Sequence, residues 1–207
     1  MSQSAPDTER DALDLYLAEF TGAPGQRVSY LEAAIRDARA ARHGSPPALW
    51  LASIGYLIAV EQIGHTVSLA ATSAAPRAGS RAAFLAAIGD FVGGGLNAAD
   101  ADVLYSVRCE LAHKYGLTNV PPYGNQEPLL FAYTSGGPLV SFRQVPWDGT
   151  VAGMSMASTT VVNLHAICDL VEDLVSTVRD LHAAGDVVLV AGITPAEIAG
   201  MLTFRSY

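Results

Sequence analysis

Residues 48–60 read ALWLASIGYLIAV, the longest apolar run in the chain. Pro46-Pro47 precede the run and Glu61 follows it, so its length of about 13 residues is too short to span a bilayer. An apolar stretch that follows a proline pair predicts a buried helix, which we expect to continue to about Ala71. Because Leu49–Val60 is apolar on nearly every side, this helix should lie at the centre of a helical bundle.

Apolar residues at helical spacing continue on both sides of this run. Leu13, Leu17 and Phe20 predict a helix over residues 11–20. Ser29 and Glu32 have the spacing of a capping box at the start of a second helix. Further helices are expected over residues 80–92, from the cap Asn97 to about residue 115, over residues 160–183, and in a short segment capped by Thr194.

Two β-like runs lie between the fifth helix and the long C-terminal one, at Leu129–Thr134 and Leu139–Val145. Ser135-Gly136-Gly137-Pro138 separates them and is a hairpin turn signal. Val187–Ala191 predicts a third strand. We therefore expect a mainly α fold in a single helical domain over residues 1–207, with a helical core at 11–115, a β-hairpin inserted at 128–146, a long C-terminal helix at 158–183 and a short tail at 186–207.

Composition excludes several classes of protein. The chain has 207 residues, 50% of them hydrophobic and 15% charged, which supports a folded core and excludes disorder as the main state. A net charge of −8 excludes general electrostatic binding of nucleic acid by the chain as a whole. Cys109 and Cys168 make no disulfide framework, and no metal-ligand set or cofactor motif is visible. The N-terminal residues are polar and acidic, unlike a secretory signal, so we expect a cytoplasmic protein that does not bind membranes.

The end of the fifth helix concentrates residues that can carry chemistry. Arg108 is followed after four residues by His113 and then, after one more, by Tyr115. This R-x4-H-x-Y pattern resembles the motif of HEPN domains, compact helical modules found in bacterial toxin–antitoxin, abortive-infection and other defence systems. Val107 and Leu111 supply apolar positions like those of the family. The resemblance covers residues 103–116 closely and the helical order of residues 11–183 more broadly.

The resemblance implies a HEPN-like helical bundle that works as a homodimer, with two copies of the motif lining one cleft. It also implies a metal-independent ribonuclease without a cofactor, acting as the toxin of a toxin–antitoxin or phage-defence system. Arg108 would hold the phosphate and His113 would act as the base. A nucleotidyltransferase antitoxin would attach a nucleotide to Tyr115 and silence the toxin.

Elementary chemistry agrees with these roles. Cleavage of RNA without a metal needs a base for the ribose 2′-hydroxyl and a cation that stabilises the charged phosphorane. An imidazole and a guanidinium supply both. Residues five apart on a helix point about 140° from each other, so Arg108 and His113 need not converge within one chain. A site shared by two copies removes this difficulty.

The residues that can carry chemistry also have purely structural interpretations. If Arg108 and His113 have no catalytic role, the negative C-terminal end of the helix macrodipole would still be a favourable place for both side chains. Glu61 is either a buried partner for an arginine or an auxiliary group in the cleft, and the first interpretation is slightly favoured. His65, on the apolar helix, is expected to be a packed core or interface residue. The arginines near the end of the second helix suit its macrodipole, with an RNA-backbone contact as the minority alternative: Arg36, Arg39 and Arg42, beside His43.

The alternative function is a non-catalytic helical dimerisation or binding module. The acidic charge favours it, and the predicted hairpin carries aromatic side chains suited to a docking surface: Phe131, Tyr133, Phe142 and Trp147. Position distinguishes the two functions. Exposure of Arg108 and His113 in a shared cleft would favour the enzyme, whereas burial of either in an ion pair within one chain would favour the module.

Overall fold

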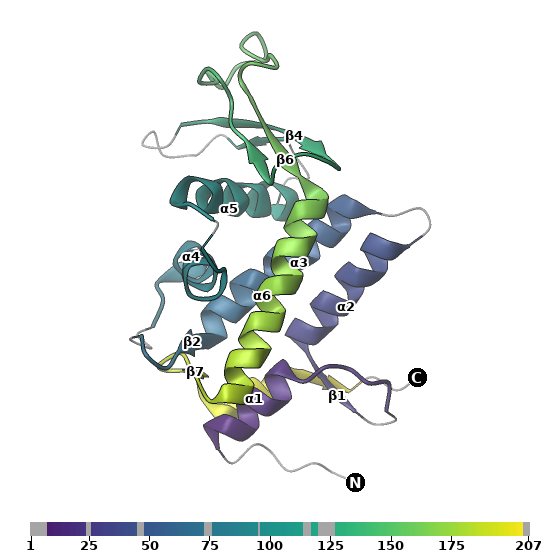
Figure 1. Ribbon diagram of the computed structural model, residues 1–207, viewed down its shortest axis with the longest axis vertical. Helices are drawn as coiled ribbons and strands as arrows, with labels where there is room; N and C mark the ends of the chain where they lie inside the picture. The colour runs from purple at the N-terminus through teal and green to yellow at the C-terminus, as the bar shows by residue number, and fades with distance from the viewer. Residues whose placement is uncertain are drawn as a thin grey trace.

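Helix α3 (Leu49–Thr66) lies at the centre of the molecule, as its apolar sequence predicts. The computed structural model describes residues 8–23, 26–44, 48–72, 76–94, 96–113, 117–119 and 127–204. In this part of the chain, α3 contacts four other helices (Figure 1): α2 (Tyr30–His43), α4 (Gly79–Phe91), α5 (Ala98–His113) and α6 (Leu164–Ala184). None of the described helices is both long and apolar enough to cross a membrane. The described part of the chain is mainly α-helical, as predicted.

Local capping signals place the starts of several helices correctly. The side chains of Ser29, Asn97 and Thr194 each accept a hydrogen bond from the backbone N–H three residues later, at 3.0, 2.9 and 3.2 Å. These bonds satisfy donors that the first turn of a helix leaves without a partner. The backbone N–H of Thr194 in turn donates to the Glu197 carboxylate, which completes a capping box for α7 (Pro195–Gly200). All three N-caps are therefore confirmed.

Other boundaries differ from the predicted ones. Helix α1 (Glu9–Leu17) starts earlier than predicted because Thr8 accepts a hydrogen bond from Asp11 N and caps the first turn, and it ends three residues before the predicted Phe20. Helix α3 stops at Thr66 rather than near Ala71. The next residues instead form β2 (Val67–Leu69), which pairs antiparallel with β7 (Val187–Leu189). The predicted third strand is thus confirmed, and its partner explains why α3 is shorter than expected.

The predicted hairpin is wrong in its pairing. The strands of the larger sheet follow the order β3-β4-β6-β5, and their bounds are β3 (Thr118–Asn119), β4 (Leu129–Thr134), β5 (Val140–Ser141) and β6 (Thr159–Asn163). Strand β6 lies between β4 and β5, parallel to the first and antiparallel to the second. Its sequence TTVVN is rich in β-branched residues, which suit a strand paired on both sides.

Strand β6 leads directly into the long helix α6. Asn163 is the junction, and its Oδ1 accepts hydrogen bonds from His165 N and Ala166 N at 3.0 and 3.2 Å. Its Nδ2 donates to Gly137 O at 2.7 Å, which ties the start of the helix to the turn between β4 and β5. The helix therefore begins at Leu164 rather than at residue 160.

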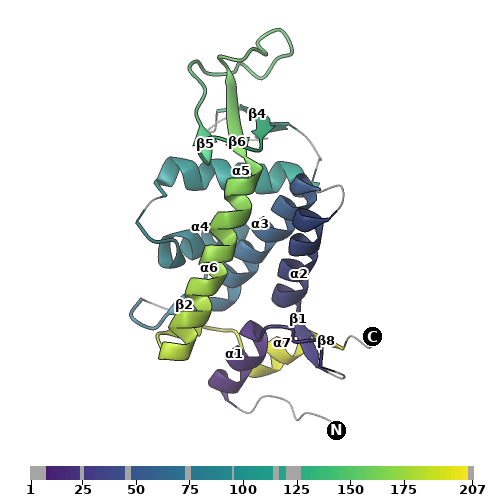
Figure 2. The same ribbon diagram turned by 45° about the vertical axis from the view of Figure 1, so that its right-hand side comes forward.

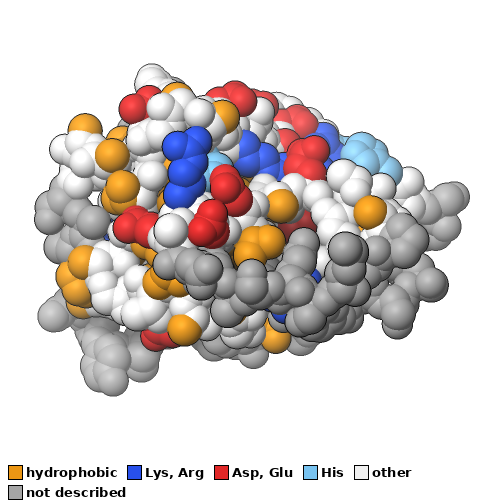
Figure 3. Space-filling view, turned by 90° about the horizontal axis from the view of Figure 1, so that it is seen from below, with side chains coloured by type: hydrophobic (Ala, Val, Ile, Leu, Met, Phe, Trp, Pro, Cys, Tyr) orange, Lys and Arg blue, Asp and Glu red, His pale blue; other side chains and the backbone are white. Residues whose placement is uncertain are grey.

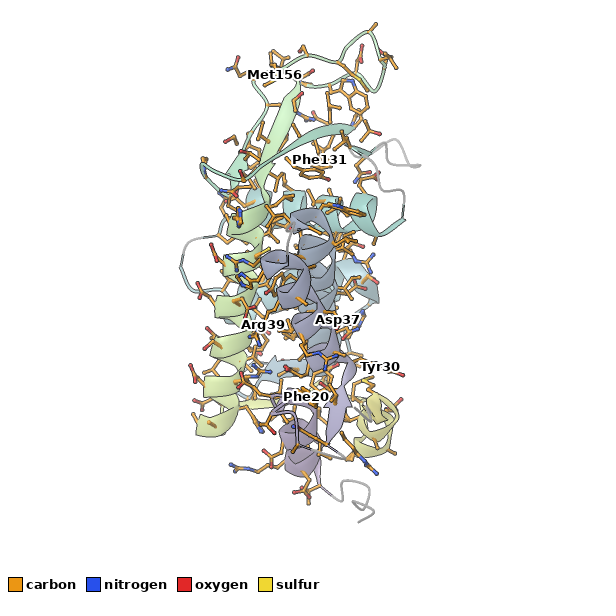
Figure 4. All side chains as sticks on the ribbon, turned by 90° about the vertical axis from the view of Figure 1, so that its right-hand side faces the viewer. Phe20, Tyr30, Asp37, Arg39, Phe131 and Met156 are labelled. Carbon is orange, nitrogen blue, oxygen red and sulfur yellow. The ribbon has the colours of Figure 1, made fainter. Side chains whose placement is uncertain are left out.

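The sheet and its loops form one end of the molecule, beyond α5 (Figures 1 and 4). Phe131 is buried between the strands and the helices, and Met156 lies among the loops at this end of the molecule (Figure 4). Trp147 is also buried, and its indole N–H donates to Thr150 O at 2.8 Å. Phe142 is half exposed. The predicted aromatic docking surface is therefore wrong for Phe131 and Trp147, because both rings pack inward.

At the opposite end, β1 (Arg27–Ser29) pairs antiparallel with β8 (Leu202–Phe204), beside α1 and α7 (Figure 2). Basic and acidic side chains are mixed on the face seen from below (Figure 3). Arg179 contacts Glu19 at 2.6 Å and Glu32 at 2.8 Å, and His182 Nε2 lies 2.7 Å from Asp14 Oδ1. Charges at this end are thus paired rather than gathered into a basic patch on the face that Figure 3 shows.

Candidate functional site

Helix α5 carries the motif and presents it to α3. Val107 and Leu111 are buried in the core, and Tyr105 packs against Phe84 of α4 with ring centroids 5.6 Å apart. These contacts fix the rotation of α5 about its own axis. Arg108 follows Val107 and is directed to the crossing of α5 with α3, where Glu61 lies.

Arg108 and Glu61 form an ion pair within the chain. Arg108 Nε lies 2.5 Å from Glu61 Oε2, and the two side chains are only 14% and 11% exposed. The contact is an ion pair by distance without hydrogen-bond geometry between these two atoms. The interpretation of Glu61 as a partner for an arginine is confirmed, and the arginine is that of the motif.

His65 extends this pair to the surface. It lies one turn after Glu61 on α3, and its Nε2 is 3.8 Å from Glu61 Oε1. Its side chain is 42% exposed, so His65 is not packed in the core of the chain, and its place at an interface stays a prediction. The two oxygens of Glu61 therefore face an imidazole on one side and a guanidinium on the other. The signal in the sequence is the four-residue spacing of Glu61 and His65, which places them on one face of a helix.

Two further motif residues stand differently. His113 is the last residue of α5, and its side chain lies outside the part of the structure that is described. Tyr115 also lies outside the described residues. The structure thus places Arg108 beside Glu61, whose other carboxylate oxygen lies 3.8 Å from His65, and the prediction that Arg108 and His113 share a site falls outside the described residues. Of the predicted site, the structure therefore describes the ion pair of Arg108 and the backbone at the end of α5.

Other groups on α5 are shaped by burial. The pKa of Tyr105 is raised to about 12, chiefly by burial and then by its hydrogen bond with Cys109. Glu110 is buried on the side of α5 that faces the sheet. The pKa of Tyr133, on β4, is raised to about 12, first by burial of the tyrosine and then by the charge of Glu110. Sequence reasoning did not single out Glu110, because a buried acid next to a motif leaves no distinctive spacing.

Two of the three arginines of α2 are paired across the bundle, whereas Arg36 contacts Asp37 of the same helix. Arg39 donates to both carboxylate oxygens of Glu172 at 2.8 and 2.6 Å, and Arg42 donates to Asp169 at 2.5 Å. Both acids belong to α6, and Tyr56 of α3 also donates to Glu172. These pairs join α2, α3 and α6. The carboxylate partners account for Arg39 and Arg42 without the alternative contact to an RNA backbone. They also give these arginines specific partners, which the macrodipole interpretation did not name.

Among the described residues, no group of three or more histidine, cysteine or acidic side chains is placed to hold a metal ion. Comparison of the chain with protein-family models, with curated proteins and with solved structures finds no significant match in any of the three.

Proposed function

We propose that this chain is a non-catalytic helical binding module with a HEPN-like bundle. The observation that carries the proposal is the ion pair between Arg108 and Glu61, in which the motif arginine is largely buried and matched by a carboxylate of its own chain. A phosphate clamp in a ribonuclease needs a cation that substrate can reach. A neutralised and buried guanidinium contributes to the core of the bundle instead.

Charge and helix order support the same proposal. A net charge of −8 opposes general capture of RNA, and the other arginines described above contact carboxylates. Arg108 and His113 lie on α5, within the helical order over which the chain resembles the HEPN family. The module would act as a homodimer, with the α5 helices near the twofold axis.

Cleavage of RNA tests the proposal directly. The purified chain is incubated with single-stranded RNA in the presence of a chelator, beside an Arg108→Lys variant that keeps a positive charge opposite Glu61. We expect wild type and variant to leave the RNA equally intact. Light scattering on the same samples should give a dimer, and a monomer at micromolar concentration would contradict the dimeric part of the proposal.

A metal-independent ribonuclease is the second candidate, and the place of His65 favours it. An exposed imidazole lies beside a carboxylate that also contacts an arginine, an arrangement that can orient groups for acid–base chemistry. In this case Arg108 would hold the phosphate of RNA, and His113 would take the 2′-hydroxyl proton.

The same assay separates the two candidates. A ribonuclease would leave 2′,3′-cyclic phosphate ends in chelator, and it would lose several orders of magnitude in rate in His113→Ala. Because His113 is the last residue of α5, we expect the variant to keep its fold, which circular dichroism would check. Cleavage by wild type that His113→Ala abolishes would overturn the non-catalytic module. Cleavage that survives in a His113→Ala/Arg108→Ala variant would refute the site of the ribonuclease.

A further inference from the structure

We propose that a cavity at the end of the molecule opposite the larger sheet binds a free α-amino acid with an aliphatic side chain. The cavity has a volume of about 230 Å³ and lies between the first turns of α1, the C-terminal end of α6 and β7. These segments meet at the lower end of the molecule in Figure 1, whereas α5 lies near the larger sheet. The inference therefore goes beyond the proposed function, and its test does not depend on whether the chain cleaves RNA.

The outer edge of β7 supplies a backbone donor and a backbone acceptor. Ala70 N donates to Asp186 O at 2.8 Å, and Val190 N donates to Thr66 O at 2.9 Å. Hydrogen-bonding directions alternate along an antiparallel strand, so the N–H and C=O groups of Val187 point away from β2. Both groups are therefore without a partner in β2, and Val187 lines the cavity.

The next outward N–H on the same edge shows what this edge binds. Leu189 donates its N–H to Glu9 Oε1 of α1 at 2.5 Å, so a carboxylate oxygen already occupies that place. On the other side, Asp186 N donates to Leu181 O at the end of α6. The open part of the edge is thus one residue long, which suits the backbone of a single amino acid. Its carboxylate can accept the Val187 N–H, and its ammonium group can donate to the Val187 C=O.

Two neighbouring side chains at the start of α1 suit the two charges of such a ligand. Arg10 lines the cavity, is exposed, and forms no ion pair with any described residue, an exception to the pairing of charges at this end of the molecule. Its guanidinium can hold a carboxylate through charge-assisted hydrogen bonds. Glu9 accepts the Leu189 N–H through Oε1, which leaves Oε2 for an ammonium group.

The remaining walls of the cavity favour an aliphatic side chain. Leu13, Val187 and Val188 provide apolar surface. His182 closes one side, where its Nε2 is held 2.7 Å from Asp14 Oδ1. Drug-sized ligands occupy pockets of roughly 300–1,000 Å³, so this cavity suits a smaller molecule. Leucine presents a carboxylate, an ammonium group and an aliphatic chain to the three kinds of wall at once.

Isothermal titration of the full chain with L-leucine and L-valine measures binding. D-Leucine is the matched control ligand, because it has the same composition and charge but cannot place its three groups on the same three walls. We expect D-leucine to bind at least about tenfold more weakly than L-leucine. The proposal is overturned if neither L-amino acid binds at millimolar concentration, or if the two enantiomers of leucine bind equally.

Leucine analogues that lack one group each test the charges. L-Leucinamide has no carboxylate and 4-methylpentanoate has no ammonium group, so both should bind at least about tenfold more weakly than L-leucine. N-Acetyl-L-leucine represents the C-terminal residue of a peptide and should also bind weakly. Binding of N-acetyl-L-leucine as tight as that of L-leucine would assign the site to a peptide end and overturn the proposal of a free amino acid.

A variant of Arg10 assigns binding to this cavity. Arg10→Met alters an exposed side chain without an ion pair, so the fold should persist, and L-leucine should bind at least about tenfold more weakly. Arg81→Met is the matched control, since it removes the same charge from a half-exposed side chain on α4. The control should bind L-leucine as wild type does. Equal affinities of wild type and Arg10→Met, or an equal loss in the control, would overturn the proposal.

Glu9→Gln tests the second charge. The amide oxygen can still accept the Leu189 N–H, while the charge that attracts the ammonium group is lost. The variant should therefore lose most of the preference for L-leucine over 4-methylpentanoate, and an unchanged preference would contradict the proposed site. If Glu9→Gln fails to fold, the melting temperature of wild type serves instead. L-Leucine should raise it more than D-leucine does, because a ligand stabilises the folded state that binds it, and an equal rise would overturn the proposal.

Discussion

The backbone of Gly64 on α3 lies directly against the carbonyl group of Ala83 on α4. A Cβ atom at residue 64 would be 1.9 Å from the oxygen of Ala83 and 2.5 Å from its carbonyl carbon. Both distances are far below van der Waals contact, and the atoms concerned are backbone atoms that cannot rotate away. The two helices pack this closely only because residue 64 has no side chain.

Gly64→Ala should consequently destabilise the fold. Accommodating the methyl group requires α3 and α4 to separate, which should cost about 2–4 kcal/mol in the free energy of unfolding. Gly89→Ala is the matched control, since Gly89 is on the exposed face of α4 and a Cβ there would meet nothing within 4 Å. The control should be neutral or stabilising by about 0.5–1 kcal/mol. Urea unfolding of both variants checks this, and equal stabilities would contradict the close packing.

Stability should fall in acid because of Glu172. Burial raises the pKa of this carboxyl, but the hydrogen bonds from Arg39 and Tyr56 outweigh burial and hold the pKa below its ordinary value of 4.5. The folded state therefore binds this proton less readily than the unfolded chain does. The ionised carboxylate contributes its full stabilisation above pH 4.5, and the contribution is lost as the pH falls through the folded-state value.

Glu172→Gln tests this pH dependence. Removing the titrating group should flatten the acid limb of the stability profile, measured as the free energy of unfolding from pH 7 downward. Asp102→Asn, in an exposed ion pair, should leave the acid limb as it is in wild type. Parallel profiles for wild type and Glu172→Gln would mean that the Arg39–Glu172 contact carries no pH-dependent stability.

A double-mutant cycle measures the pair at the crossing of α3 and α5. Arg108→Met leaves the carboxylate of Glu61 in a buried place without its cation, which should cost about 2–4 kcal/mol. Glu61→Leu should be costly for the converse reason. The variant with both changes should recover much of the loss, because two apolar side chains can replace a buried ion pair. Additive losses in thermal or urea unfolding would show that the two residues do not stabilise each other.

Tyr115 provides a prediction that applies if the chain is a ribonuclease. An attached nucleoside phosphate would add negative charge seven residues after Arg108 in the sequence and would compete with the substrate phosphate for that cation. Tyr115→Phe should keep cleavage and escape silencing by a nucleotidyltransferase partner, with intact-mass measurement reporting the modification. A Tyr115→Phe chain that is silenced as well as wild type would remove this switch.

Local signals made much of the helical architecture predictable. The caps Ser29, Asn97 and Thr194 act within one turn, so neighbouring residues alone determine them. The central position of α3 was predictable because its sequence is apolar on nearly every side, whereas a helix at the surface carries polar residues on its exposed face. Helix ends were less certain because apolar residues such as Val67 suit a helix and a strand equally, and only the distant partner β7 decides between them.

Pairing between distant residues was the part that sequence could not provide. The turn at residues 135–138 predicted a hairpin, yet β6, which begins only at Thr159, lies between its two strands. The chemistry of Glu61 was predictable, since a single acid in an apolar helix needs a cation. That the cation is Arg108, and that His65 lies on the other side of the carboxylate, depends on how α5 crosses α3.

The β1–β8 ladder constrains the order in which the chain can fold. It pairs Val28 with Thr203, so its hydrogen bonds close a loop that contains nearly every other element. During synthesis, β1 emerges before α2, while β8 emerges after all the helices described above. The helical contacts are closer in sequence and should form first. Closure of the ladder is therefore expected to be a late event, and in pulsed hydrogen exchange the amides of Val28 and Thr203 should gain protection after those of α3.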